Sequence, residues 1–193
     1  MGGSGQTGGT KHPDALILID VINDFEFPGA RKLLRSAETV ADRIAALKAR
    51  AGRAGVPIVY VNDNFGRWRS DFRQQVEHCM ARGCPGRKIV EKLQPDENDF
   101  FVLKPMHSGF YSTTLALLLD ELGSRRLILC GFAADLCVLY TANDAYMRHF
   151  DLAVPADCTA AETRERYRFA LQHIENQLKA DIRDAAKIRF RRK

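Results

Sequence analysis

Short apolar runs alternate with segments of helical periodicity along most of this chain, and no other feature constrains the fold as strongly. The runs have the length of strands buried on both faces, and they cover residues 15–19, 56–62, 100–104, 126–131 and 151–155. Such alternation predicts an α/β fold in three α-β-α layers. Its sheet is expected to be mostly parallel and doubly wound, with five or six strands and helices on both faces.

Helix signals lie between the apolar runs. A short helix is expected near 70–80, and a longer one over 136–149. Ser112 is the expected N-cap of the helix after the third strand. Thr159 and Glu162 are expected to form the capping box of the last helix.

The length of 193 residues favours one domain. Residues 1–13 are expected to be a flexible, glycine-rich tail, residues 14–180 the folded domain, and residues 181–193 a basic C-terminal tail. The net charge of +5 is concentrated in that tail, at Lys187, Arg189, Arg191, Arg192 and Lys193.

A solvated tail explains these charges more simply than a nucleic-acid site does, because no basic module interleaved with aromatic residues accompanies them. No apolar stretch approaches the ~18 residues that span a membrane. No secretion signal is recognisable at the N-terminus. The sequence therefore predicts a cytoplasmic protein without nucleic-acid or membrane partners.

The cysteines show no disulfide or zinc-binding pattern. Their number is odd and no two of them form a CxxC pair. Most are therefore expected to be reduced, buried thiols, at positions Cys79, Cys84, Cys130, Cys137 and Cys158.

Three chemically different side chains follow the ends of predicted strands. Asp20 closes the first strand, Lys104 closes the third, and Cys137 follows the fourth at the start of a helix. The carboxyl ends of parallel strands share one edge of a sheet, where such folds bind ligands, so these side chains are expected to converge. Singly, each has an ordinary explanation: a turn-capping carboxylate, a surface lysine and a core thiol.

The surroundings of Cys137 are expected to favour its thiolate form. A helix N-terminus carries partial positive charge, and the Lys104 ammonium would add to it. Both should lower the pKa of the Cys137 thiol, which should then react fast with thiol reagents below pH 7.

Three segments resemble the motifs of one family. LILIDVINDF (16–25), KPMHSGFYSTTLALLL (104–119) and CGFAADLCV (130–138) are similar to the aspartate, lysine and nucleophile motifs of the isochorismatase-like cysteine hydrolases, which include nicotinamidases. The resemblance spans roughly residues 14–180. It implies the isochorismatase-like, Rossmann-like fold and a homo-oligomer, either a dimer or a tetramer.

The resemblance also implies roles for individual residues. Asp20 would be the proton acceptor, Lys104 the positioning cation and Cys137 the nucleophile. The backbone N–H groups of Ala133 and Cys137 would form an oxyanion hole, with a cis peptide between Phe132 and Ala133. Water activated by the same aspartate would then release the acid from a thioester.

The chain departs from better-known relatives at two places. Nicotinamidases carry an Asp-x-His metal-binding element after the second strand, whereas residues 61–72 contain Asp63 and no histidine. No metal and no cofactor are therefore expected. True isochorismatases, which cleave a vinyl ether, generally lack the cysteine, so Cys137 argues against that reaction.

The leading hypothesis is a metal-independent hydrolase that cleaves the C–N bond of a small amide-like molecule through a thioester acyl-enzyme. The alternatives are an isochorismatase-type vinyl-ether hydrolase and a catalytically silent protein of the same fold that binds a small anion. Substrate contacts are expected from loop residues, for which core or interface packing is the ordinary alternative. These residues are Phe25, Asn64, Phe65, Trp68, His107, Phe110 and Tyr111.

Overall fold

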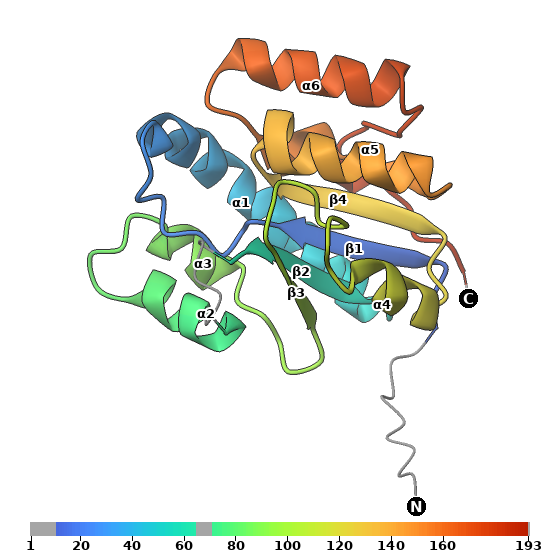
Figure 1. Ribbon diagram of the computed structural model, residues 1–193, viewed down its shortest axis with the longest axis horizontal. Coiled ribbons are helices and arrows are strands. Elements are labelled where there is room, and N and C mark those ends of the chain that lie inside the picture. Colours follow the sequence, from blue (N-terminus) through green and yellow to red (C-terminus); the bar gives the residue numbers. More distant parts are fainter. Residues whose placement is uncertain (1–10, 65–70, 193) are drawn as a thin grey trace, which may run out of the picture.

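A six-stranded sheet forms the centre of the protein. The computed structural model describes residues 11–64 and 71–192, and the sheet order is β3-β2-β1-β4-β5, with β6 beside β4 (Figure 1). Neighbouring strands are parallel throughout this sheet. The strands are β1 (Asp14–Ile19), β2 (Ile58–Asp63), β3 (Phe100–Lys104), β4 (Arg126–Phe132), β5 (Asp151–Ala153) and β6 (Thr159–Ala160).

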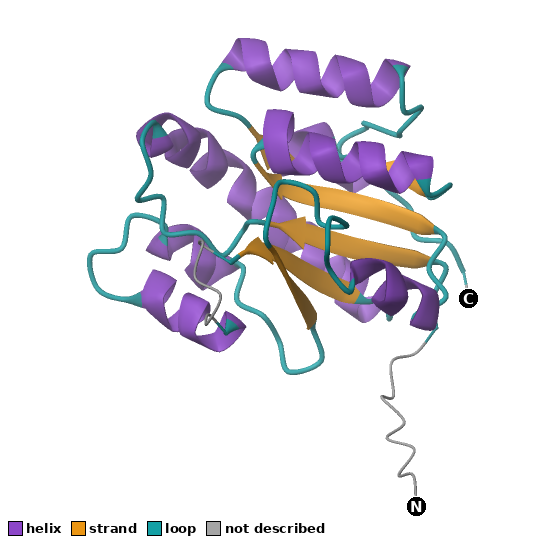
Figure 2. Ribbon diagram, viewed as in Figure 1, coloured by secondary structure: helices purple, strands orange, loops and turns teal. Residues whose placement is uncertain are grey.

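Helices cover both faces of the sheet, so the three-layer α/β prediction is confirmed (Figure 2). One face packs on α1 (Ala30–Arg53), α2 (Phe72–Met80) and α3 (Arg87–Lys92). The other packs on α4 (Leu115–Glu121), α5 (Leu139–Met147) and α6 (Arg164–Asn176).

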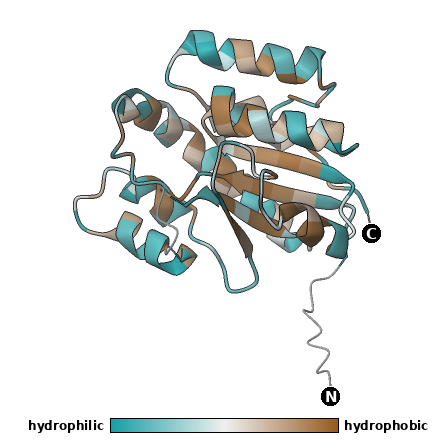
Figure 3. Cartoon of the chain, viewed as in Figure 1, coloured by the Kyte–Doolittle hydropathy of each residue, from teal (hydrophilic) through white to brown (hydrophobic). Residues whose placement is uncertain are grey.

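The continuous apolar run of β1 is explained by burial on both faces. Leu16 and Leu18 point to the α1 side, while Ile17 and Ile19 point to the α5 side, because successive side chains of a strand alternate. Every residue of β1 is buried. Figure 3 shows the apolar residues gathered in the strands and on the helix surfaces that face them.

Two of the expected helix caps are wrong. The helix α4 has Thr114 at its N-cap, and Ser112 lies two residues earlier with a left-handed φ of 51°. Thr159 lies in β6, and the N-cap of α6 is Thr163, whose side chain accepts a hydrogen bond from the Arg166 N–H. Several hydroxyl residues precede each helix, and sequence spacing does not distinguish which of them adopts the capping backbone conformation.

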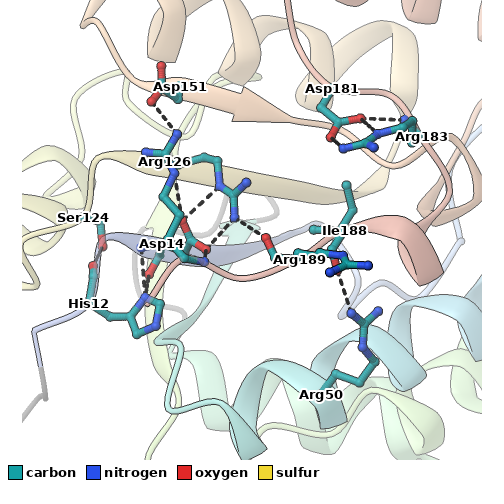
Figure 4. Close-up of polar contacts among 11 residues, drawn as sticks. His12, Asp14, Arg50, Ser124, Arg126, Asp151, Asp181, Arg183, Ile188 and Arg189 are labelled. Carbon is teal, nitrogen blue, oxygen red and sulfur yellow. Dashed lines mark hydrogen bonds and ion pairs between the residues drawn. The ribbon is translucent and has the colours of Figure 1, made fainter. Parts of the chain in front are cut away.

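The segment 181–192 is not the solvated basic tail that its charge suggested. It runs back along the sheet, and Ile188 is 1% exposed. Arg50 donates from α1 to the Ala185 carbonyl at 2.8 Å. It also donates to the Ile188 carbonyl at 2.6 Å (Figure 4).

Asp14, at the beginning of β1, fixes the same segment. Its carboxylate accepts two hydrogen bonds from Arg126, at 2.9 and 2.6 Å, and one from the Arg191 N–H at 2.8 Å. Arg126 also donates to the Arg189 carbonyl at 2.7 Å (Figure 4). His12 is likewise buried and not part of a flexible tail, with its Nδ1 accepting the Asp14 N–H.

Among the residues that the structure describes, none of the helices is both long and apolar enough to cross a membrane.

Candidate active site

Asp20, Lys104 and Cys137 lie in contact at the carboxyl ends of the strands. Lys104 Nζ is 2.9 Å from Asp20 Oδ2 and 3.4 Å from Cys137 Sγ. Lys104 comes from β3, two strands away from β1, and its long side chain crosses the end of β2 to reach Asp20. The geometric convergence expected from the strand ends is therefore present.

The backbone after β1 aims Asp20 at this cluster. Asp20 has a left-handed φ of 51°, and its N–H donates to the Val61 carbonyl at 3.0 Å. Its Oδ1 accepts the Asp63 N–H at 2.7 Å, while Oδ2 faces Lys104. Both carboxylate oxygens are thus held in place by groups from β2 and β3.

Close packing of β4 on β1 requires glycine at position 131. Gly131 has a φ of 121°, and a Cβ there would lie 2.0 Å from the Ile19 carbonyl oxygen. A side chain at this position would push β4 away from the end of β1, and with it the turn that carries Cys137.

Cys137 belongs to a single π-helical turn, Ala134–Val138, which leads into α5. The Leu136 and Val138 N–H groups both donate to the Ala133 carbonyl. The peptide bond between Phe132 and Ala133 is cis, at the position where the family resemblance places one. Within the described parts of the chain, the Ala133 N–H makes no backbone–backbone hydrogen bond.

Burial and neighbouring charges act in opposite directions on the pKa of Lys104. Desolvation alone would lower the pKa of Lys104, but the negative charges of Asp20 and neighbouring groups outweigh it, and the pKa is raised. Although Lys104 is fully buried, its raised pKa keeps it an ammonium at neutral pH.

The expected lowering of the Cys137 pKa is wrong. Burial and the adjacent Asp20 carboxylate raise the pKa of this thiol well above its usual range, and Lys104 opposes them only in part. The resting cluster at neutral pH is therefore a carboxylate, an ammonium and a protonated thiol.

Two of the expected substrate-contacting aromatics lie in the core. Phe25 is 4% exposed and packs against Phe132, with the ring centroids 6.1 Å apart. Phe110 is 5% exposed, and its ring packs on Phe150 and under the Arg148 guanidinium. For both residues the structure favours packing, the ordinary alternative.

The other residues expected to contact substrate differ in where they lie. Asn64 is buried, and its N–H donates to the Lys104 carbonyl at 3.1 Å. Tyr111 is 58% exposed, whereas His107 places Nδ1 3.8 Å from Cys137 Sγ. Phe65 and Trp68 lie outside the described residues.

Sequence reasoning gave no site role to two neighbours of the cluster. Asp63 Oδ2 is 3.7 Å from Lys104 Nζ, so a second carboxylate shares this ammonium. The Tyr140 ring lies 5.5 Å from the His107 ring. The strand-end rule could have indicated Asp63, which ends β2, and the helical spacing of three from Cys137 could have indicated Tyr140.

One group of side chains in the described part of the chain is close enough to share a metal ion. Asp24, Glu26 and His78 offer ligand atoms within 4.8 Å of one another. All three are at least partly exposed, and exposed acidic groups of this kind are common without an ion.

A parallel α/β sheet with an aspartate, a buried lysine and a cysteine meeting at its strand ends is the arrangement expected of the isochorismatase-like class. The Isochorismatase domain family matches residues 14–187. The chain belongs to this family.

Named relatives extend the comparison. The chain is 40% identical to the uncharacterized isochorismatase family protein YaaI of Bacillus subtilis (strain 168) over 173 residues, which cover 90% of this chain and 94% of that protein. It is 29% identical to the ureidoacrylate amidohydrolase RutB of Methylobacterium radiotolerans, over 83% of this chain and 72% of that protein. The structure of N-carbamoylsarcosine amidase from Thermoplasma acidophilum superposes with a TM-score of 0.69 at 25% identity, covering 91% and 98% of the two chains.

Proposed function

We propose that this protein is a metal-independent cysteine hydrolase that cleaves the C–N bond of a small amide-type molecule through a thioester on Cys137. The observation that carries this proposal is the position of Lys104 Nζ, 2.9 Å from Asp20 Oδ2 and 3.4 Å from Cys137 Sγ. Relatives named as amidohydrolases and amidases support a C–N bond as the target.

Acylation begins from the protonated thiol. As Sγ attacks the substrate carbonyl carbon, its proton passes to Asp20, so sulfur never has to exist as a free thiolate. Lys104 remains beside the sulfur and the carboxylate and stabilises the negative charge that moves between them. The raised pKa of the resting thiol is consistent with this coupled transfer.

The developing oxyanion is bound by the backbone N–H groups of Ala133 and Cys137. The Ala133 N–H, which has no backbone partner in the described residues, is available for this purpose. One such donor typically contributes ~3 kcal/mol to transition-state stabilisation. Collapse of the tetrahedral intermediate breaks the C–N bond, and the proton on Asp20 goes to the departing ammonia or amine. Water then hydrolyses the thioester and restores the thiol.

A screen for ammonia release tests this proposal. Purified protein is incubated with small primary amides and N-carbamoyl compounds, beside the Cys137→Ala and Asp20→Asn variants. Cys84→Ala is the matched control, because Cys84 is a partly buried thiol whose Sγ contacts the Asp24 carbonyl. We expect release by the wild type and the control, and loss of at least ~100-fold in both site variants. A substrate hydrolysed equally well by Cys137→Ala would contradict the proposal.

A further inference from the structure

His107 occupies the solvent side of the Cys137 sulfur. Its Nδ1 is 3.8 Å from Cys137 Sγ, and the His107 residue is exposed. Asp20 is 6% exposed and Lys104 is fully buried, so these two groups approach the sulfur from the protein interior. The thiol therefore lies between a buried ion pair and an exposed imidazole.

The loop after β3 holds His107 in this place. The next residue, Ser108, donates a hydrogen bond to the Asp144 carboxylate on α5. The Gly109 N–H donates to Thr141 Oγ1, also on α5, at 2.9 Å. Because α5 continues directly from the turn that contains Cys137, these contacts hold the loop that carries His107 next to that turn.

Close packing at Gly109 and a ring contact limit the position of His107 further. A Cβ at Gly109 would lie 2.8 Å from Val61 Cγ1, so the loop lies directly on the sheet. On its other side the His107 ring packs on the Tyr140 ring, at 5.5 Å between centroids.

The two half-reactions of a thioester mechanism make different demands on a base. In the first, the proton comes from the buried thiol, and Asp20 is the adjacent acceptor. In the second, the proton comes from a water molecule that enters from solvent. Asp20 is 6% exposed, and its oxygens face the Asp63 N–H and Lys104 in the interior, away from entering water. His107 is exposed to that solvent, and an imidazole nitrogen can accept a proton from water as a general base.

We infer that His107, and not Asp20 as the family resemblance implies, is the general base of deacylation, an inference that rests on the thioester route proposed above. The water oxygen attacks the thioester carbon while Nδ1 accepts one water proton. The tetrahedral intermediate then collapses with cleavage of the C–S bond. The departing sulfur takes the proton from the same Nδ1, which lies 3.8 Å from it. One water is consumed, one carboxylic acid is formed, and both the thiol and the neutral imidazole are restored.

Pre-steady-state kinetics with p-nitrophenyl acetate test this inference. The burst of p-nitrophenolate measures acetylation of the enzyme, and the later steady rate measures deacetylation. His107→Gln is compared with the wild type and with His78→Gln, the same change at an exposed histidine of α2 that contacts Asp24. Intact-mass analysis and peptide mapping locate the acetyl group, and thermal melting checks the fold of each variant.

We expect His107→Gln to keep the burst within about twofold of the wild-type rate, while the steady rate falls ~100-fold, within the range usual for loss of a general base. Acetyl-Cys137 should then accumulate. In His107→Ala, added imidazole should restore the steady rate without changing the burst. The control His78→Gln should behave as the wild type.

The acetyl group on Cys137 distinguishes a failure of the His107 proposal from a failure of the thioester route. An acetyl group that leaves His107→Gln as fast as it leaves the wild type overturns the role of His107 alone. A burst slowed as strongly as the steady rate also overturns it, because His107 would then act on the attacking thiol. Absence of any acetyl group on Cys137 in the wild type overturns the thioester route itself, and the inference with it.

Discussion

Replacing Asp20 with asparagine should have opposite effects on turnover and on thiol reactivity. The amide keeps the size of the side chain and can still accept the Asp63 N–H, but it removes the negative charge. Turnover should fall by at least ~100-fold, since the proton acceptor is lost. Alkylation of Cys137 at neutral pH should become faster, because the carboxylate raises the pKa of the thiol whereas Lys104, which lowers it, remains.

The size of the second effect follows from the geometry. Lys104 Nζ lies 2.9 Å from Asp20 Oδ2 and 3.4 Å from Cys137 Sγ, so the carboxylate oxygen and the sulfur are at most about 6 Å apart. Two unit charges at that distance interact with about 3 kcal/mol at an effective dielectric constant of 20. Since each 1.4 kcal/mol is about a factor of ten, an interaction of this size corresponds to a ~100-fold rise in the thiolate population. Side-chain rearrangement reduces this, and we expect alkylation ~10- to 100-fold faster.

The assay is the pseudo-first-order rate of iodoacetamide labelling at pH 7, with peptide mapping to assign each cysteine. Asp120→Asn, the same change on the exposed surface of α4, is the matched control and should label at the wild-type rate. The buried Cys79, Cys130 and Cys158 report unfolding, because they are labelled only if the fold opens. An Asp20→Asn protein that is folded and labelled no faster than the wild type would refute the electrostatic coupling.

Three further predictions concern the thiol and the fold. In the wild type, the rate of Cys137 labelling should be low at neutral pH and should rise about tenfold per pH unit into the alkaline range. The reason is that burial and Asp20 raise the pKa of the thiol. Fast labelling that is independent of pH would contradict this. Asp14→Asn should lower the free energy of unfolding by ~3–5 kcal/mol in urea titrations. The change leaves the Arg126 side chain, which is 15% exposed, without the buried carboxylate that neutralises it. A loss below about 1 kcal/mol would mean that the ion pair contributes little to stability. Gly86→Ala should lower the free energy of unfolding by more than about 2 kcal/mol, since its Cβ would lie 1.9 Å from the Asn23 carbonyl oxygen. A Cβ at Gly52 in α1 meets nothing within 4 Å, so Gly52→Ala should be neutral or stabilising by up to ~1 kcal/mol. Equal effects of the two changes would contradict the packing at Gly86.

The sheet and the convergence of the cluster could be predicted from sequence because both depend on local patterns and one topological rule. The run at 15–19 is apolar at every position, a pattern typical of a short strand that is buried on both faces. Parallel strands then place Asp20 and Lys104 at the same edge, whatever the strand order.

The protonation state of Cys137 could not be predicted, because it is a balance of opposing effects. The sequence identifies a cation and a helix start near the thiol, both of which lower its pKa. The sequence does not show how deeply the Cys137 thiol is buried or how close Asp20 lies to it. These two effects outweigh that of Lys104 and raise the pKa of the thiol. The aromatics presented a similar difficulty: Phe110 and His107 follow the same strand, yet one faces the core and the other the sulfur.

The C-terminal segment was misjudged for a related reason. A run of basic residues predicts a solvent-exposed segment unless a buried acidic side chain pairs with it. Here that acid is Asp14, which lies 177 positions away from Arg191 in the sequence. Nothing in the local composition of either segment indicates that they pair.

The central claim is that Cys137 carries the acyl group during hydrolysis, and trapping that group tests it most directly. A slowly hydrolysed amide found in the ammonia screen is mixed with enzyme, quenched in acid within one turnover, and analysed by intact mass and peptide mapping. The account predicts a covalent acyl group on Cys137 alone, absent from Cys137→Ala and from Asp20→Asn. Ammonia release at the full rate with no acyl group on any cysteine would contradict it.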